Sequence, residues 1–206
     1  MINIPGGLIL FISGVPGVGK TTISYELLKR IEQFRIIEET DLMRDILRGY
    51  NDFLTKEFGS SASIIFDTIK ISGHNKLLTL DEAKAQCRIM KNSIEQIVLR
   101  QQRKSIATII NGVHIIPEIL QEITSYSNVI FINLYISDEK KIYHRIFERD
   151  PHSYMLKNIP LIYKTNVDLY MSTKNISKST SNIHNIDVTN LSIEMVIERI
   201  LSIISI

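Results

Sequence analysis

A glycine-rich segment near the start of the chain carries residue types that can bind phosphate. Gly14, Gly19, Lys20 and Thr21 fill the fixed positions of the pattern G-x-x-x-x-G-K-[ST]. Glycines there let backbone N–H groups turn toward phosphate oxygens, and a following helix directs its positive end at the same oxygens. We expect Lys20 to reach the β- and γ-phosphates and the Thr21 hydroxyl to bind Mg²⁺. The predicted nucleoside triphosphate site comprises Gly14, Val15, Pro16, Gly17, Val18, Gly19, Lys20, Thr21 and Thr22.

The flanking residues agree with this interpretation. Residues 8–12 form a continuous apolar run, which is typical of a buried parallel strand. After the loop, apolar side chains recur at helical spacing, at Ile23, Leu27, Ile31 and Phe34. The sequence therefore predicts the strand, loop and helix that the phosphate-binding motif requires.

Asp41 is the first candidate for chemistry on the bound phosphates. It follows residues 35–37, which predict a short second strand, and lies in residues 41–48, which predict the start of a helix. An aspartate at this place can bind Mg²⁺ or accept the proton of a substrate hydroxyl. Alternatively, Thr40 or Asp41 only caps the helix, although a capping carboxylate keeps one oxygen free for a second role.

Three basic side chains are candidates for binding the substrate. Arg44 and Arg48 are four residues apart and share one helix face, where two guanidinium groups suit a doubly charged anion. A solvated face paired with Asp45 or Glu39 fits the same spacing. His114 follows the predicted third strand, so it either binds substrate or phosphate or has a structural role.

A basic ridge is predicted on a later helix. Lys141, Arg145 and Arg149 follow one another at four-residue steps. Kinases with a phosphate loop close such arginines over the transferring phosphoryl group, because the reaction depends on positioning and charge neutralisation. Arg145 and Arg149 are the expected catalytic arginines, in a lid of about 138–160. The alternative is a solvated face paired with Glu148 or Glu139.

Alternating strand and helix patterns must position these residues. Further strands are predicted at 105–110, 129–136 and 183–188, and further helices at 62–71, 81–97, from Pro117, at 138–149, within 151–175 and from Ile193 after an N-cap at Ser192. Strands separated by helices predict a single domain over 1–206, a three-layer α/β/α fold with a parallel, mostly five-stranded sheet. Ligands of such sheets bind at the carboxyl ends of the strands.

Composition argues against several classes of protein. The chain has 24 Lys and Arg residues and 22 acidic residues, which gives a net charge of +2. This charge does not indicate a basic surface that would bind nucleic acid. No apolar run approaches the roughly 20 residues of a membrane span. The single Cys87 cannot form an internal disulfide, and we expect a soluble, cytoplasmic protein. No N-K-x-D segment follows the loop, which disfavours a GTPase.

Three further motifs resemble the 2-phosphoglycerate kinase family of P-loop kinases over about residues 8–150. They are T-D-x-x-R-x-x-x-R (Thr40, Asp41, Arg44, Arg48), G-V-H-x-x-P (Gly112, Val113, His114, Pro117) and D-E…R-x-x-x-R (Asp138, Glu139, Arg145, Arg149). The resemblance implies a nucleoside-monophosphate-kinase-like fold. It also implies transfer of the γ-phosphoryl of ATP, with Mg²⁺, to the 3-hydroxyl of 2-phosphoglycerate, which gives 2,3-bisphosphoglycerate. A serine pair of that family corresponds to Ser60 and Ser61, implied substrate contacts.

Two departures from the family pattern keep other acceptors open. The family usually has Glu where this chain has Asn111, so metal organisation is expected to fall on Thr21 and Asp41. The extra N-terminal region of longer members, with any regulatory module, is expected to be missing. The alternatives are a kinase of a nucleotide, sugar, aminoacyl-tRNA or peptidoglycan precursor, or a nucleotide-binding regulator without transfer activity. The expected base-reading loop, 187–190, does not distinguish ATP from GTP.

Overall fold

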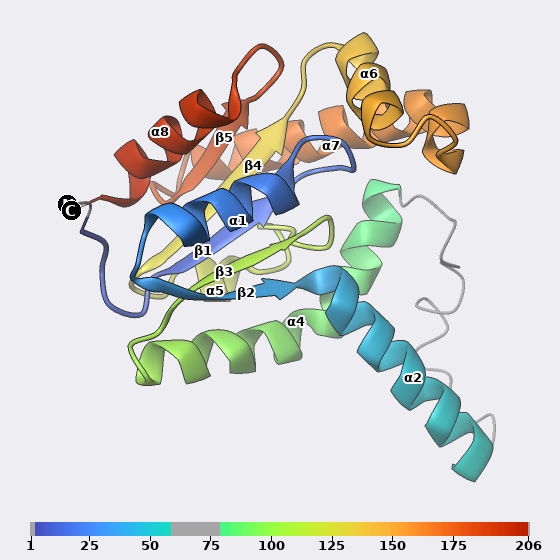
Figure 1. Cartoon of the computed structure of the whole chain (residues 1–206). Coiled ribbons are helices and arrows are strands. Elements are labelled where there is room, and N and C mark those ends of the chain that lie inside the picture. Colours follow the sequence, from blue (N-terminus) through green and yellow to red (C-terminus); the bar gives the residue numbers. More distant parts are fainter. Residues whose placement is uncertain (1–2, 59–78, 206) are drawn as a thin grey trace.

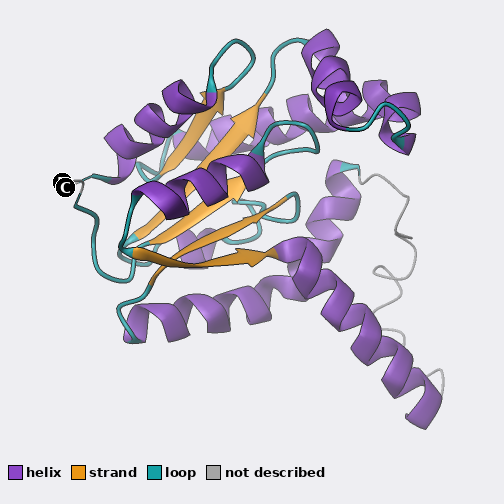
Figure 2. Cartoon of the chain, viewed as in Figure 1, coloured by secondary structure: helices purple, strands orange, loops and turns teal. Residues whose placement is uncertain are grey.

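The central element is a five-stranded parallel sheet. The computed structural model describes residues 3–58 and 79–205. The strands are β1 (Ile9–Ser13), β2 (Phe34–Glu39), β3 (Ala107–Gly112), β4 (Val129–Tyr135) and β5 (Ile183–Asp187), and their spatial order is β2-β3-β1-β4-β5. β1 pairs in parallel with β3 on one side and β4 on the other. Figure 2 shows the strands inside a shell of helices, which confirms the expected α/β architecture.

Helices cover both faces of the sheet (Figure 1). They are α1 (Lys20–Arg30), α2 (Thr40–Phe58), α4 (Leu80–Arg103), α5 (Gln121–Thr124), α6 (Glu139–Arg149), the 3₁₀ helix η3 (Tyr154–Asn158), α7 (Ile159–Ser177) and α8 (Ile193–Ile204). Figure 1 places α1 and α8 over one face and α4 and α5 over the other. None of the helices in residues 3–58 and 79–205 is long and apolar enough to cross a membrane.

Alternation along β1 divides the core into two halves. Leu10 and Ile12 pack in the half that includes α1 and α8, whereas Ile9 and Phe11 pack in the half that includes α4. The whole strand is buried because both faces of a central parallel strand are covered. This buried strand holds the start of the phosphate loop in a fixed position.

Most predicted elements are present, with shifted boundaries. α1 ends at Arg30 because Ile31 adopts an extended conformation, so Phe34 belongs to β2 and not to the helix. Pro117 does not open a helix, since α5 begins only at Gln121. Ser192 caps α8 as predicted, its hydroxyl accepting a hydrogen bond from the Met195 amide. The predicted helix at 62–71 lies outside the described residues.

α2 projects away from the sheet, as Figure 1 shows. Its first residue, Thr40, is fully buried, whereas apolar side chains farther along are exposed. These side chains are Leu42, Ile46, Tyr50 and Phe53. Only the beginning of α2 therefore contributes to the edge of the sheet where ligands of this fold bind.

Candidate active site

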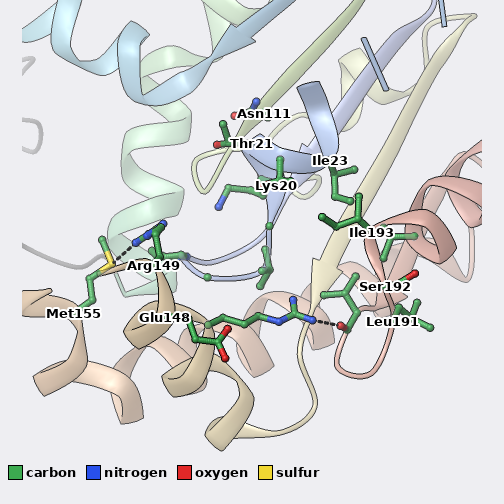
Figure 3. A pocket seen from close by; sticks show the side chains of 18 of the residues that line it. Lys20, Thr21, Ile23, Asn111, Glu148, Arg149, Met155, Leu191, Ser192 and Ile193 are labelled. Carbon is green, nitrogen blue, oxygen red and sulfur yellow. Dashed lines mark hydrogen bonds between the residues drawn. The ribbon is translucent and has the colours of Figure 1, made fainter. Parts of the chain in front are cut away.

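A cavity of about 690 Å³ lies at the carboxyl ends of the strands. Its lining comes from the phosphate loop, the ends of β2 and β3, helix α6 and the segment that leads into α8. The lining residues are Pro16–Ile23, Glu39, Asp41, Asn111, Arg145, Glu148, Arg149, Met155, Val188, Leu191, Ser192, Ile193 and Val196. Figure 3 shows Lys20 and Thr21 between Arg149 and Met155 on one wall and Leu191, Ser192 and Ile193 on the other.

The phosphate loop has the backbone conformation that its glycines permit. Gly14 has φ +143°, and a Cβ there would lie 2.5 Å from the carbonyl oxygen of Leu134 on the neighbouring β4. Gly19 precedes α1 in a left-handed conformation, and no side chain caps the helix there. The first amides of α1 are therefore left for an anion, as expected for this motif. Pro16–Thr22 line the cavity, whereas the buried Gly14 and Val15 lie behind it.

Lys20 is placed to contact the phosphates. Its Nζ donates a hydrogen bond to the carbonyl oxygen of Val15 at 3.0 Å, inside the loop. Removal from water lowers the pKa of Lys20 to about 8; the charges of Asp41 and Glu39 raise it, and that of Arg149 lowers it. The ammonium group of Lys20 is thus a buried cation, and the negative charge of a bound triphosphate would balance it.

This depressed pKa predicts that nucleotide binding takes up a proton. Above pH 8 free Lys20 is mostly neutral, and bound phosphates raise its pKa again because they favour the charged form. Proton uptake should therefore be near zero at pH 6.5 and rise toward one per site at pH 9, while affinity falls. Calorimetry of ADP binding in buffers of different ionisation enthalpy measures this proton uptake. Lys20→Arg, which stays protonated, should abolish the uptake; equal uptake in that variant would contradict the assignment.

Asp41 lines the cavity at the first turn of α2. Its side chain is 58% exposed, and Oδ1 lies 3.4 Å from Arg44 Nη2 and 3.8 Å from His114 Nδ1. Asp41 and Lys20 line the same cavity, and the charge of Asp41 raises the pKa of Lys20. The structure thus brings together the predicted phosphate-binding lysine and the predicted base.

The arginines of α2 pair within their own helix. Arg48 Nη1 lies 2.9 Å from Asp45 Oδ1, and Arg44 Nε lies 3.9 Å from the same oxygen. Neither arginine lines the cavity. The ion pairs with Asp45 are the alternative that the spacing left open, so a role in binding substrate stays a prediction. Ser60 and Ser61 lie outside the described residues.

His114 is fully buried between β3 and α2. Its Nδ1 lies 3.1 Å from Thr40 Oγ1, and Nε2 has no hydrogen-bond partner within residues 3–58 and 79–205. Burial lowers the pKa of His114 to about 4, against the opposing effect of Asp41, so the ring is neutral near pH 7. In this conformation His114 supports the start of α2 and does not line the cavity.

The two predicted lid arginines lie in different parts of the cavity. Arg149 affects the pKa of Lys20, and its Nη2 contacts Met155 Sδ at 3.8 Å, as Figure 3 shows. Arg145 instead donates from Nη2 to the carbonyl oxygen of Val188 after β5. α6 also packs on the phosphate loop, since a Cβ at Gly17 would lie 3.1 Å from Ile146. The structure thus brings Arg149, but not Arg145, toward Lys20.

Asn111 connects β3 to the phosphate loop. Its Nδ2 donates to Ser24 Oγ at 3.1 Å, and the Ser24 hydroxyl donates to the Lys20 carbonyl oxygen at 2.9 Å. Figure 3 shows Asn111 next to Thr21. Sequence reasoning did not select Asn111, Glu39, Glu148, Met155 or Val188 as site residues. The strand-end position of Glu39 and Asn111 gave a signal that could have found them, and the family pattern, which usually has Glu at position 111, gave a second signal for Asn111.

The oxygen donors of the cavity suit a hard cation. The Thr21 hydroxyl and the carboxylates of Glu39 and Asp41 line the same space, and Mg²⁺ prefers few protein oxygens because it keeps several waters and binds substrate phosphates. Within the described residues no three His, Cys, Asp or Glu side chains form a complete metal site. These residues therefore fit a metal that enters with a nucleotide.

No family model matches the chain, but its sequence is similar to those of several kinases. It is 28% identical to the 2-phosphoglycerate kinase of Methanothermobacter thermautotrophicus (69% of this chain, 47% of that protein) and 27% identical to that of Methanococcus maripaludis (93% and 65%). A mevalonate-3-phosphate 5-kinase of Thermoplasma acidophilum is 28% identical (74% and 72%). The chain spans about half to two thirds of the length of these 2-phosphoglycerate kinases.

Solved structures support the fold. A gluconokinase from Sinorhizobium meliloti superposes with a TM-score of 0.60 at 11% identity, covering 97% of this chain and 93% of that one. A shikimate kinase from Acinetobacter baumannii, in complex with shikimate, gives 0.53 at 14% identity (98% and 93%). The phosphate loop, the strand order and these likenesses agree with the resemblance read from the motifs: the chain has the α/β fold of these kinases, and its sequence is similar to those of 2-phosphoglycerate kinases.

Proposed function

We propose that this chain is an ATP-dependent phosphotransferase that transfers the γ-phosphoryl group to a hydroxyl of a small phosphorylated metabolite, first of all 2-phosphoglycerate. The observation that carries the proposal is the shared space of Lys20 and Asp41 at the carboxyl ends of β1 and β2. Phosphoryl transfer needs a cation at the transferring group and a group that orients the attacking hydroxyl. The cavity contains both.

The nucleotide fits the cavity in one direction. Its triphosphate lies over Pro16–Thr22, where the α1 amides and Lys20 bind it. The base then extends toward the apolar wall of Val188, Leu191 and Ile193, next to Arg145. The guanidinium group that now donates to the Val188 carbonyl would lie against the base, where arginine stacks well.

Transfer then follows from the positions of the charged groups. The acceptor hydroxyl forms a bond to the γ-phosphorus as the bond to the β,γ-bridging oxygen breaks, and Asp41 takes the hydroxyl proton. Lys20 and Arg149 neutralise the phosphoryl oxygens. Thr21 would hold Mg²⁺ with a carboxylate of the site, and the metal supplies further charge neutralisation at the β- and γ-phosphates.

The choice of acceptor rests on the relatives. The relatives are named 2-phosphoglycerate kinase and mevalonate-3-phosphate 5-kinase. Both names describe an acceptor that is a phosphate ester with a further hydroxyl group. Arg44 and Arg48 follow Asp41 on α2, and they would bind the phosphate of the acceptor if their ion pairs with Asp45 open. Ser60 and Ser61 complete the proposed substrate contacts.

An acceptor panel tests this proposal. Purified chain is incubated with labelled ATP and Mg²⁺ and with 2-phosphoglycerate, mevalonate 3-phosphate, gluconate, shikimate or nucleoside monophosphates. We expect rapid labelling of 2-phosphoglycerate and a decrease in kcat of about 10²–10⁴-fold in Asp41→Asn. Rapid turnover of another acceptor beside inert 2-phosphoglycerate would overturn the substrate, and unchanged kcat in Asp41→Asn would overturn the role of Asp41.

A second candidate is a nucleotide-binding regulator without transfer activity. Asn111 favours it, because an amide that is engaged with Ser24 cannot act as a base. Tight ATP binding without transfer to any acceptor in the panel would support this candidate.

A further inference from the structure

Glu39 is a carboxylate of the cavity that has no partner among the described residues. It is the last residue of β2 and lines the cavity beside the phosphate loop. Its carboxylate makes no hydrogen bond or ion pair with any side chain or backbone group within 3–58 and 79–205. Glu39 lines the same cavity as Lys20 and Thr21, where phosphates would bind.

The other oxygen-bearing side chains at this edge are already engaged. Asp41 Oδ1 faces Arg44 and His114, at 3.4 and 3.8 Å. Asn111 is neutral, and its amide group donates to Ser24. Among the described residues at the ends of β2 and β3, Glu39 therefore has the carboxylate that no other side chain engages.

The sheet register places Glu39 next to Asn111. The two residues are partners in the parallel pairing of β2 with β3, and adjacent strands lie about 4.8 Å apart. Asn111 in turn lines the same cavity as Thr21 (Figure 3). A glutamate on the next strand has a longer side chain than asparagine, so it would reach a bound Mg²⁺ through one of the waters that this ion commonly keeps.

We propose that Glu39 is the carboxylate that would hold a water of the Mg²⁺ bound with the nucleotide, together with the Thr21 hydroxyl. The proposal rests on the proposed function only in requiring a magnesium nucleotide. Asp41 is thereby left to act on the acceptor hydroxyl, and Asn111 to keep the phosphate-loop helix in place. The two acidic residues of the segment Glu39-Thr40-Asp41 thus have separate tasks.

Magnesium-dependent nucleotide binding tests the assignment without any transfer. ADP and a non-hydrolysable ATP analogue are titrated calorimetrically with Mg²⁺ and with EDTA. We expect Glu39→Gln to reduce the apparent Mg²⁺ affinity of the nucleotide complex about 10- to 100-fold, the usual effect of losing an outer-shell partner. Affinity in EDTA should stay equal or increase, because the variant removes a negative charge from the phosphate site.

Neighbouring substitutions provide the controls. Glu38→Gln removes a carboxylate from the adjacent position of the same strand, which does not line the cavity, and should leave Mg²⁺ dependence unchanged. Glu39→Asp keeps the charge on a shorter side chain, so its apparent Mg²⁺ affinity should lie between those of Glu39→Gln and the unaltered chain. Mn²⁺ electron paramagnetic resonance gives a second measurement, in which Glu39→Gln should weaken Mn²⁺ binding to the nucleotide complex.

The outcomes separate this proposal from the proposed function. Equal Mg²⁺ dependence in Glu39→Gln and Glu38→Gln, or binding by the unaltered chain that does not depend on Mg²⁺, would overturn the role of Glu39. Magnesium-dependent binding that Glu39→Gln weakens, without transfer to any acceptor, would leave that role standing and overturn the phosphotransferase.

Discussion

Lys20→Met is expected to reduce phosphoryl transfer by about 10²–10³-fold, the effect of removing one charged donor from a pre-organised site. Methionine keeps the length of the side chain but has no charge for the γ-phosphoryl oxygens. The loop itself should persist, because its conformation depends on Gly14 and Gly19 and on the buried β1. Steady-state kinetics with the best acceptor of the panel measure kcat and KM for ATP.

Lys29→Met is the matched control for this substitution. Lys29 lies on the same helix and pairs with Glu26 at the surface, where an ion pair contributes about 0–1 kcal/mol to stability. Its replacement should leave kcat unchanged. Unchanged transfer in Lys20→Met would contradict the placement of the γ-phosphoryl group at Lys20. An equal decrease in both variants would point to a general loss of structure.

Gly112→Ala is expected to destabilise the protein by about 3 kcal/mol, which combines overpacking with backbone strain. A Cβ at Gly112 would lie 1.7 Å from Thr40 Oγ1, and the residue has φ +153°. Thr40 is fully buried at the start of α2, so neither side can move without shifting Asp41. Urea unfolding should show a lower midpoint with an unchanged slope, and nucleotide binding should weaken.

Two further variants test the cause of this effect. Gly49→Ala, inside α2 with open space around it, should instead stabilise the protein by about 0.5–1 kcal/mol. Gly112→Ala combined with Thr40→Ala removes the hydroxyl oxygen that causes the clash and should recover part of the stability. A double variant as unstable as the sum of both single variants would contradict this contact.

The phosphate loop could be predicted from sequence because each part of its pattern has a local cause. A buried strand, glycines at fixed places and a helix directly after Lys20 can all be recognised without tertiary contacts. The end of α1 could not, because Phe34 continues the helical spacing although Ile31 already has an extended backbone. Periodicity reports which side chains share a face and not where the chain turns.

The walls of the site depend on contacts between distant segments. Val188, Leu191 and Ile193 look like core residues in the sequence, and only the docking of α6 against the loop after β5 makes them a wall. Glu39 was considered only as a possible partner for arginines, since the β2–β3 register that sets it beside Asn111 cannot be derived from one strand. Spacing also could not decide whether Arg44 and Arg48 pair with Asp45.

The central position of β1 has a consequence for the order of folding. Ile9 pairs with Thr108 on one side and Val129 on the other, so the innermost strand acquires its neighbours only after a long stretch of chain has been ordered. Such non-local pairing makes folding slow because loop closure must precede the contacts that reward it. The cavity is complete only when the segment after β5 lies beside α6, where Arg145 donates to the Val188 carbonyl oxygen. A nucleotide therefore has its complete site only in the finished fold, and shifts the equilibrium toward that state as a pharmacological chaperone does.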